Sequence, residues 1–327
     1  MQIGKIPGDK LKEIVLNKIN YKRDDVLLHA GIGEDTAVID PANDLIVISS
    51  DPITGASKNA GYLAVHVSCN DIASAGAKPL GIQVVLLLPA EITDQEIAGL
   101  MEEINDTARK IEVEVLGGHT EILSAVNKPI IVVTAVGKAV RGKFVSSAGA
   151  EPGDDIIITK GIGIEGTYIL ANDYYDELSK KGVKPELLKR ACSYGNKLSV
   201  IKEGIIAARM GANAMHDITE GGLYGALEEL SQATGLGFEL YEDKLLLTEE
   251  TAVICKMMEI EPTALISSGS MLITIENGEE LIKELADNGI EAAVIGKVTS
   301  GGNYVYKKGS KEIFNWSGKD ELWRVME

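Results

Sequence analysis

Short apolar segments alternate with longer segments of helical character along almost the whole chain of 327 residues. The alternation runs through both halves, so we expect mixed α/β structure and not separate all-α and all-β domains. The segment IQVVLLLP at 82–89 is almost entirely apolar, which indicates a strand buried on both faces. Length and pattern together predict two α/β domains of similar size.

Local signals place the expected elements. The expected strands cover residues 37–40, 45–51, 82–89, 112–118, 128–139, 154–160, 212–218, 270–275, 292–298 and 303–308. The expected helices cover residues 61–75, 93–111, 165–172 and 278–288, with others reaching Arg209 and one after Gly222. Thr93 and Glu96 have the spacing of a capping box. The glycine- and serine-rich segment 141–154 predicts a boundary between domains 1–145 and 146–327.

Charge and composition narrow the function. A net charge of −17 argues against a nucleic-acid partner and against a membrane surface. A bound nucleotide would therefore need glycine loops, backbone N–H groups or metal ions held by carboxylates. The longest apolar stretch, at 82–90, is too short to cross a bilayer. Three isolated cysteines and the lack of a signal-peptide pattern predict a cytoplasmic protein.

Several acidic residues stand in glycine turns, at expected strand ends or beside an asparagine in an apolar helix. They are Glu34, Asp35, Asp51, Asp71, Glu121 and Asp217. Strand ends and the turns after them are where α/β folds gather ligand groups. Asp71 follows Asn70 in a largely apolar helix, where an ionised carboxylate needs a cation or several donors. Magnesium is the natural cation, and a carboxylate that merely reaches water is the alternative. Cys69 in the same helix is expected to be a buried thiol.

Two glycine pairs complete the set of candidate residues. Gly117 and Gly118 precede His119, which could shuttle a proton, contact a phosphate or serve as a hydrogen-bonded structural imidazole. Gly221 and Gly222 follow Thr219 and precede an expected helix. That arrangement suits an anion, although it can also be a simple turn. The chain has no P-loop motif, and its one GxGxxG spacing, at 161–166, is a weak dinucleotide signal.

Taken in chain order, these segments resemble one superfamily. GIGEDTAVI, ISSDPI, CNDIASAGAKPLG, LGGHTE, SAGAEPGD, HDITEGGL and IGKV are similar to segments of the ATP-dependent enzymes related to aminoimidazole ribonucleotide (AIR) synthetase, or PurM. The superfamily includes thiamine-monophosphate kinase, selenophosphate synthetase and HypE. HypE, a hydrogenase maturation factor, is the most similar group, on HDITEGGL, residues 237–262 and SSGSMLITI.

The resemblance implies a PurM-like α/β fold of two domains. The N-terminal, ferredoxin-like domain would form a shared β-barrel in a homodimer, and each chain would bind ATP and Mg²⁺. Asp35, Asp51 and Asp71 would be the metal carboxylates. The further cofactor-binding residues would be Gly33, Asn70, Gly117, Gly118, Thr219, Gly221 and Gly222. Asp71, His119 and Glu121 are the candidate catalytic residues. Such enzymes activate an oxygen by phosphoryl transfer, through positioning and charge neutralisation.

Three departures change the expected acceptor. HypE proteins end in a flexible tail whose terminal cysteine carries the substrate group, whereas this chain ends in DELWRVME with no cysteine after Cys255. His119 replaces an acidic residue, as in selenophosphate synthetase, and Glu220 replaces the arginine of the family's T-R-G-G segment. We therefore expect Mg-ATP chemistry on a small-molecule acceptor. The alternatives are a kinase similar to thiamine-monophosphate kinase, a non-catalytic ATP-binding regulator, and hydrogenase maturation with an acceptor supplied in trans.

Overall fold

The computed structural model describes residues 4–5, 12–28, 38–40, 42–53, 59–316 and 318–326. Its contacts divide the chain into two compact units. Unit 1 holds residues 1–72 and 77–142, and unit 2 holds residues 73–76 and 143–327. In the described ranges, no helix has both the length and the apolar composition needed to cross a bilayer. The ATP-binding and dimerisation roles expected of the N-terminal domain remain predictions.

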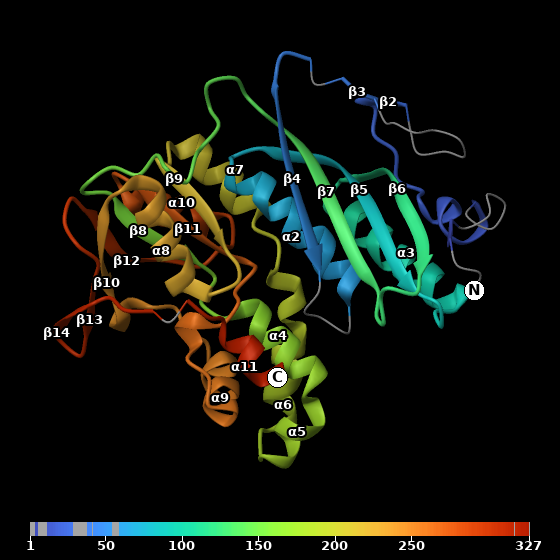
Figure 1. Cartoon of the computed structure of the whole chain (residues 1–327). Coiled ribbons are helices and arrows are strands. Elements are labelled where there is room, and N and C mark those ends of the chain that lie inside the picture. Colours follow the sequence, from blue (N-terminus) through green and yellow to red (C-terminus); the bar gives the residue numbers. More distant parts are fainter. Residues whose placement is uncertain are drawn as a thin grey trace. The chain divides into compact units, whose positions relative to one another are not determined.

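Unit 1 contains a five-stranded sheet in the order β1-β6-β5-β7-β4 (Figure 1). Its strands are β1 Gly4–Lys5, β4 Leu45–Ile53, β5 Lys78–Pro89, β6 Glu114–Leu123 and β7 Ile130–Ala139. β5 and β6 are parallel, and the other neighbouring strands are antiparallel. A separate ladder joins β2 Val26–Leu28 to β3 Val38–Ile39, and η1 spans Leu16–Lys18.

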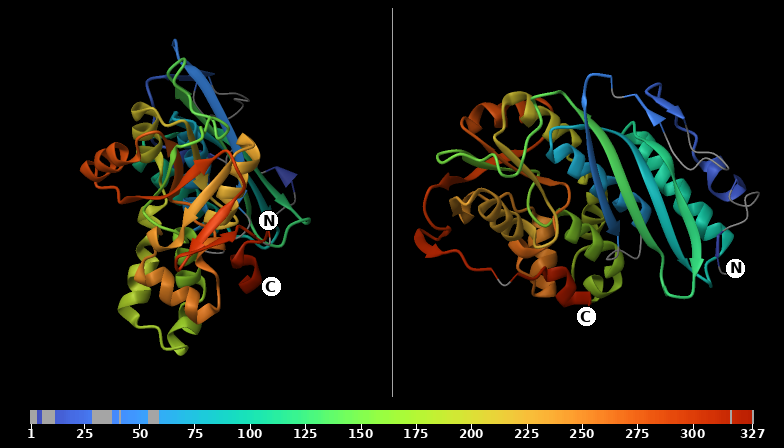
Figure 2. Two further views of the ribbon diagram at one scale, coloured as in Figure 1. Left: turned by 90° about the vertical axis from the view of Figure 1, so that its left-hand side faces the viewer. Right: turned by 45° about the horizontal axis from the view of Figure 1, so that its top comes forward.

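Helices α2 (Ala60–Ser74) and α3 (Asp94–Lys110) lie on the same face of this sheet (Figures 1 and 2). The prediction of a capping box at the start of α3 is confirmed. The Thr93 hydroxyl accepts a bond from the Glu96 N–H at 3.2 Å, and the Glu96 carboxylate accepts one from the Thr93 N–H at 2.8 Å. On the opposite face of the sheet, Ile46 and Ile48 are exposed by 42% and 65%.

Two expected strand ends in unit 1 are wrong. β4 does not end at Asp51 but continues through Pro52 to Ile53. Proline is tolerated there because β4 is an edge strand of the sheet. The strand expected at 112–118 does not end at Gly118 either, because β6 runs on past its two glycines to Leu123.

The glycine pair of β6 forms an irregularity within the strand instead of ending it. The pairing of β6 with β5 shifts register next to Ile82 and then continues with Gln83 opposite Gly117 and Val84 opposite Gly118. A Cβ atom on Gly118 would lie 1.8 Å from the Val84 carbonyl oxygen. Gly118 is therefore required by the close approach of two strands, whatever else it does.

Unit 2 is built on a seven-stranded mixed sheet in the order β14-β13-β10-β12-β8-β11-β9. Its strands are β8 Asp155–Thr159, β9 Ala214–Ile218, β10 Gly237–Tyr241, β11 Ser270–Ile275, β12 Ala292–Thr299, β13 Tyr304–Lys307 and β14 Ser310–Ile313. β10 and β13 are parallel, and the other pairs are antiparallel. The expected alternation of strands and helices in this half is confirmed.

Helices cover both faces of this sheet. Ile156 and Ile158 of β8 pack in one core with α8, and Ile157 between them packs in a second core with α7 and α10. A further group, α4 with α5, α6 and α9, stands together beside the sheet (Figure 1). The helices are α4 Ile164–Asp173, α5 Tyr175–Lys180, α6 Pro185–Cys192, α7 Ile201–Met210, α8 Gly222–Thr234, α9 Glu249–Met258, α10 Gly278–Asp287 and α11 Glu321–Met326. The short helices are η2 Ser193–Lys197, η3 Glu242–Lys244 and η4 Pro262–Ala264.

Candidate functional site

Unit 1 brings together two of the predicted carboxylates. The Ser49 hydroxyl donates a hydrogen bond to Asp71 Oδ2 at 2.5 Å and lies 3.4 Å from Asp51 Oδ2. One hydroxyl thus stands between two carboxylates that come from different elements, β4 and α2. Both carboxyl-bearing residues are partly exposed, so a ligand in solvent can reach them.

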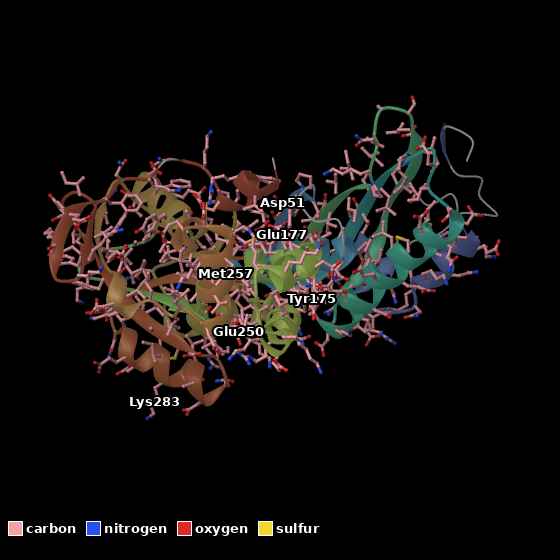
Figure 3. The ribbon with its side chains drawn as sticks, turned by 90° about the horizontal axis from the view of Figure 1, so that it is seen from below. Asp51, Tyr175, Glu177, Glu250, Met257 and Lys283 are labelled. Carbon is pink, nitrogen blue, oxygen red and sulfur yellow. The ribbon has the colours of Figure 1, made fainter. Side chains whose placement is uncertain are left out.

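The alternation of β4 explains this meeting. Residues 45, 47, 49, 51 and 53 are the less exposed positions of the strand, so Ser49 and Asp51 point to the same face. Asp51 is labelled in Figure 3. On α2, Asn70 is fully buried beside Asp71. Asp71 therefore stands at the margin of a packed helix, as its apolar neighbours predicted.

Cys69 of α2 is the buried thiol that the sequence predicted. It is fully buried, and burial raises the pKa of its thiol to about 12, with the Asp71 charge adding to the rise. A thiol with this pKa carries almost no thiolate at neutral pH, so it is a poor nucleophile. None of Cys69, Cys192 and Cys255 is in a disulfide.

His119 and Glu121 lie on the other face of the unit 1 sheet. His119 pairs with Val85, Val85 with Val132, and Val132 with Pro52. Residues paired across neighbouring strands share a face, whereas consecutive residues of a strand point to opposite faces. His119 therefore shares its face with Pro52, and Asp51 points to the opposite face. In unit 1 of a single chain, the His119 imidazole is therefore not in contact with the carboxylates of Asp51 and Asp71.

His119 and Glu121 form a surface pair of their own. His119 Nε2 lies 3.4 Å from Glu121 Oε2, and the two side chains are 43% and 34% exposed. Gly117 and Gly118 precede them in the same strand. The roles predicted for these four residues remain predictions.

In unit 2 the double glycine lies where the sequence placed it, just before α8. Gly221 and Gly222 both have a left-handed φ, and the Thr219 carbonyl accepts a bond from the Gly222 N–H at 3.1 Å. The Gly221 N–H, an expected anion donor, donates instead to Asp320 Oδ2 at 2.6 Å. A carboxylate of the chain itself thus occupies this donor.

Two tryptophans near the C-terminal end of the chain also contact this loop. The ring of Trp316 packs so close to Gly221 that a Cβ there would lie 2.7 Å from it. The Trp323 indole N–H donates to Glu220 Oε1 at 2.7 Å. Glu220, at the position of the family arginine, therefore has a partner within unit 2.

Sequence reasoning missed Glu165, near the start of α4. Its side chain is only 4% exposed, and burial raises the pKa of its carboxyl to about 7. The charges of Asp320 and Asp217 raise it further. Asp217, singled out from the sequence, accepts a bond from the Ser74 hydroxyl at 3.0 Å. The available signal was a lone acid in the apolar segment GIEGTYILA.

The residues that would hold a metal are described only in part. Asp51 and Asp71 supply oxygen ligands of the kind Mg²⁺ prefers. The third predicted carboxylate, Asp35, and the predicted Gly33 lie outside the described residues. Across the described ranges, no group of three or more His, Cys, Asp or Glu side chains is placed to hold a metal ion. The donor chemistry fits Mg²⁺, with positions left for phosphate oxygens and water.

Two family models match this chain. Residues 33–139 match the AIR synthase related protein, N-terminal domain, and residues 151–308 match the AIR synthase related protein, C-terminal domain. Together they span most of both units.

Individual proteins are similar over nearly the full chain. A putative hydrogenase expression/formation protein of Methanocaldococcus jannaschii is 30% identical over 312 residues, covering 90% of this chain and 88% of that protein. A carbamoyl dehydratase HypE of Rhizobium leguminosarum bv. viciae is 24% identical, covering 90% and 86%. A crystal structure of hydrogenase maturation protein HypE in complex with ATP aligns with a TM-score of 0.76 at 19% identity, covering 97% and 96%. The expected two-domain PurM-like α/β fold is thereby confirmed.

Proposed function

The chain belongs to the AIR synthase-related family, and we propose that it is an ATP-dependent enzyme that activates an oxygen of a small-molecule acceptor by phosphoryl transfer. The observation that carries the proposal is the pair of carboxylates, Asp51 and Asp71, on either side of the Ser49 hydroxyl. In a chain with a net charge of −17, two such carboxylates facing one point favour a divalent cation.

The two carboxylates and the serine between them have different tasks. Asp51 and Asp71 would hold Mg²⁺, with Asp35 as the third predicted ligand. The Ser49 hydroxyl fixes the orientation of the Asp71 carboxylate by donating to it, which keeps that ligand pre-positioned. Mg-ATP, when bound, supplies the phosphoryl group and a cation that neutralises the charge developing on its oxygens.

The names of similar proteins support this chemistry. One relative is a carbamoyl dehydratase, another is a hydrogenase expression/formation protein, and a HypE of the same fold was solved with ATP. Hydrogenase maturation with an acceptor supplied in trans is the alternative function. Cytoplasmic location is part of the proposal and is supported by three cysteines that form no disulfide.

We also propose a homodimer through the open face of the unit 1 sheet. That face exposes Ile46 and Ile48, and it carries His119 and Glu121 as well. Apolar side chains on an uncovered sheet face favour a second sheet as partner. Sedimentation should therefore give a dimer, and Ile48→Glu should give a monomer that retains the unit 1 fold; a monomeric wild type would contradict the proposal.

Substitutions at the carboxylate pair test the enzyme itself. Wild-type protein should be stabilised thermally by Mg-ATP and should turn ATP over with a suitable acceptor, as followed by ³¹P NMR across candidate carboxamides, phosphate esters and aminoimidazole precursors. Asp71→Asn keeps the shape of the side chain but removes its charge. It should lower turnover by at least about a hundredfold, because one metal ligand is lost, while leaving the circular dichroism spectrum unchanged.

Neighbouring serines on β4 provide a matched control. Ser49→Ala should weaken the response to Mg-ATP, because it frees the Asp71 carboxylate to turn. Ser50→Ala removes a hydroxyl from the other face, where it bonds with the Thr134 hydroxyl at 2.8 Å, and should not weaken that response. Stabilisation by Mg-ATP without turnover on any acceptor would indicate an ATP-binding regulator. No stabilisation of the wild type would refute the proposal.

A further inference from the structure

Buried polar atoms gather around the double-glycine loop of unit 2, on segments that contact it. Glu165 Oε2, Ser268 Oγ and Trp316 Nε1 are buried and make no hydrogen bond of ordinary geometry with the described residues, although the Ser268 hydroxyl lies close to the Glu165 carboxyl. Buried polar atoms of native proteins are nearly all paired, so each such exception asks for a ligand or an ordered water. Three such buried polar atoms on neighbouring segments indicate a single ligand site.

The hydrogen bonds of these segments bring them to one place. Gly166, next to Glu165, donates its N–H to the Ile266 carbonyl at 2.9 Å. Ser267 donates its N–H to the Thr219 carbonyl at 3.4 Å. This bond joins the segment that carries Ser267 and Ser268 to the double-glycine loop. The hydroxyl and backbone N–H of Ser268, a residue only 1% exposed, face the Glu165 carboxyl.

This place lies beyond the carboxyl ends of two strands of the unit 2 sheet. β8 and β9 both run antiparallel to β11, and Ile218, the last residue of β9, pairs with Ser270, the first residue of β11. The carboxyl ends of β8 and β9 therefore meet the segment that precedes β11.

The charge at this place is negative. The charged groups that act most strongly on Glu165 are Asp320 and Asp217, both carboxylates, and Glu220 acts in turn on Asp320. The Gly221 N–H, which could have bound an anion, already donates to Asp320. A phosphate would thus meet several carboxylates and lack this donor. A group that carries positive charge and N–H donors would meet acceptors.

We propose that Glu165 and Ser268, with Asp217 and Asp320 behind them, form a binding site for an organic cation with N–H donors: a protonated amine, amidine or guanidine. Trp316 Nε1, a donor, would bond to an oxygen of the same molecule or to a water. The further inference that this cation is one end of the acceptor rests on the proposed function. The existence of the binding site does not depend on that function.

The ionisation of Glu165 gives the site a pH dependence. With a pKa of about 7, the carboxyl is mostly neutral at pH 6 and mostly ionised at pH 8. Because the ionised form attracts a cation, binding should tighten as pH rises. For a group with this pKa, the ionised fraction, and with it the affinity, should rise about tenfold between pH 6 and pH 8.

Calorimetric titration of the full chain with methylguanidinium and ethylammonium tests the site. Both probes should bind, with affinity about tenfold higher at pH 8 than at pH 6, whereas N-methylurea and inorganic phosphate should not bind. Glu165→Gln and Ser268→Ala should each weaken binding of the cations at pH 8, Glu165→Gln by about tenfold or more. Glu177→Gln, an exposed carboxylate on α5 (Figure 3), is the control and should bind as wild type does.

Other outcomes overturn the site. Phosphate binding that Glu165→Gln improves, cation binding that neither variant changes, or no cation binding to the wild type would each do so. Stabilisation by Mg-ATP is measured in the same samples. Cation binding without a response to Mg-ATP would remove the proposed function and leave the site, and the reverse result would remove the site alone. If Glu165→Gln does not fold, Ser268→Ala and the pH dependence of the wild type decide.

Discussion

Replacing Glu165 by glutamine should change how the stability of the protein depends on pH. Burial raises the pKa of this carboxyl from an ordinary 4.5 to about 7, so the folded chain holds its proton more tightly than the unfolded chain. The resulting stabilisation is complete below about pH 4.5 and is lost as pH rises through about 7. Each tenfold change in proton affinity is worth about 1.4 kcal/mol, so the loss amounts to roughly 3 kcal/mol.

Glutamine has nearly the same shape but is neutral at every pH, so it avoids this loss. Urea unfolding of wild type and Glu165→Gln at pH 5 and pH 8, followed by tryptophan fluorescence, isolates the effect, because all other titrating groups are common to both. The free energy of unfolding of the variant, relative to wild type, should be about 2 to 3 kcal/mol higher at pH 8 than at pH 5. Glu177→Gln should show no such change.

The same pH dependence in wild type and Glu165→Gln would refute this reasoning, because it would mean that Glu165 ionises in the folded chain as easily as in solution. A variant more stable than wild type at pH 8 would mean that the native carboxylate is retained at a cost. Residues that reduce stability in this way are typical of binding sites, where the strain is relieved by the ligand.

The remaining predictions concern stability and metal dependence. Gly118→Ala should prevent unit 1 from folding, because its Cβ would lie 1.8 Å from a β5 carbonyl oxygen, whereas Gly117→Ala, with nothing within 4 Å, should fold with a lower melting temperature. Lys160→Met should cost about 3 to 5 kcal/mol by thermal unfolding, because it strands the buried carboxylate of Glu203, and adding Glu203→Leu should recover part of the loss. Thr93→Ala should cost about 1 kcal/mol in urea unfolding through loss of the capping box. ATP with a chelator should not raise the melting temperature, whereas Mg-ATP should.

Local sequence signals predicted most helices and strands, since they depend on neighbours along the chain. The Thr93–Glu96 box is complete within one turn, and the apolar segment at 82–89 is a central strand, β5. The prediction that this strand is buried on both faces is wrong, because Gln83 is exposed and Val85 and Leu87 are only partly buried. The ends of β4 and β6 could not be predicted in the same way. Whether Pro52 or Gly117 ends a strand depends on the edge position of β4 and on the pairing of β6 with β5, which are tertiary facts.

The candidate site also has features that motifs predict and features that depend on tertiary packing. Motif position identified Asp51 and Asp71, but their link through Ser49 requires the placement of α2 against β4. His119 shares the motif set, yet the alternation of side chains along β6 and β4 puts it on the other face of the sheet. Glu165 belongs to no motif, and its altered acidity arises only when α4 and the segments carrying Asp217 and Asp320 pack around it.

Both glycine pairs fit a ligand and a neighbouring backbone equally well in the sequence. In the structure, the Cβ of Gly118 would strike a β5 carbonyl, and that of Gly222 would lie 2.6 Å from the Leu265 carbonyl oxygen. A glycine in the sequence thus indicates that some atom comes close to the backbone, but it does not indicate whether that atom belongs to a ligand or to the chain itself. Carboxylates are more informative, because an ionised oxygen out of water must have a counter-charge. The two proposals rest on two such sets of carboxylates, one around Ser49 and one around Glu165. Both proposals assign a positive partner to these carboxylates: the metal of a nucleotide around Ser49, and the cationic end of an acceptor around Glu165.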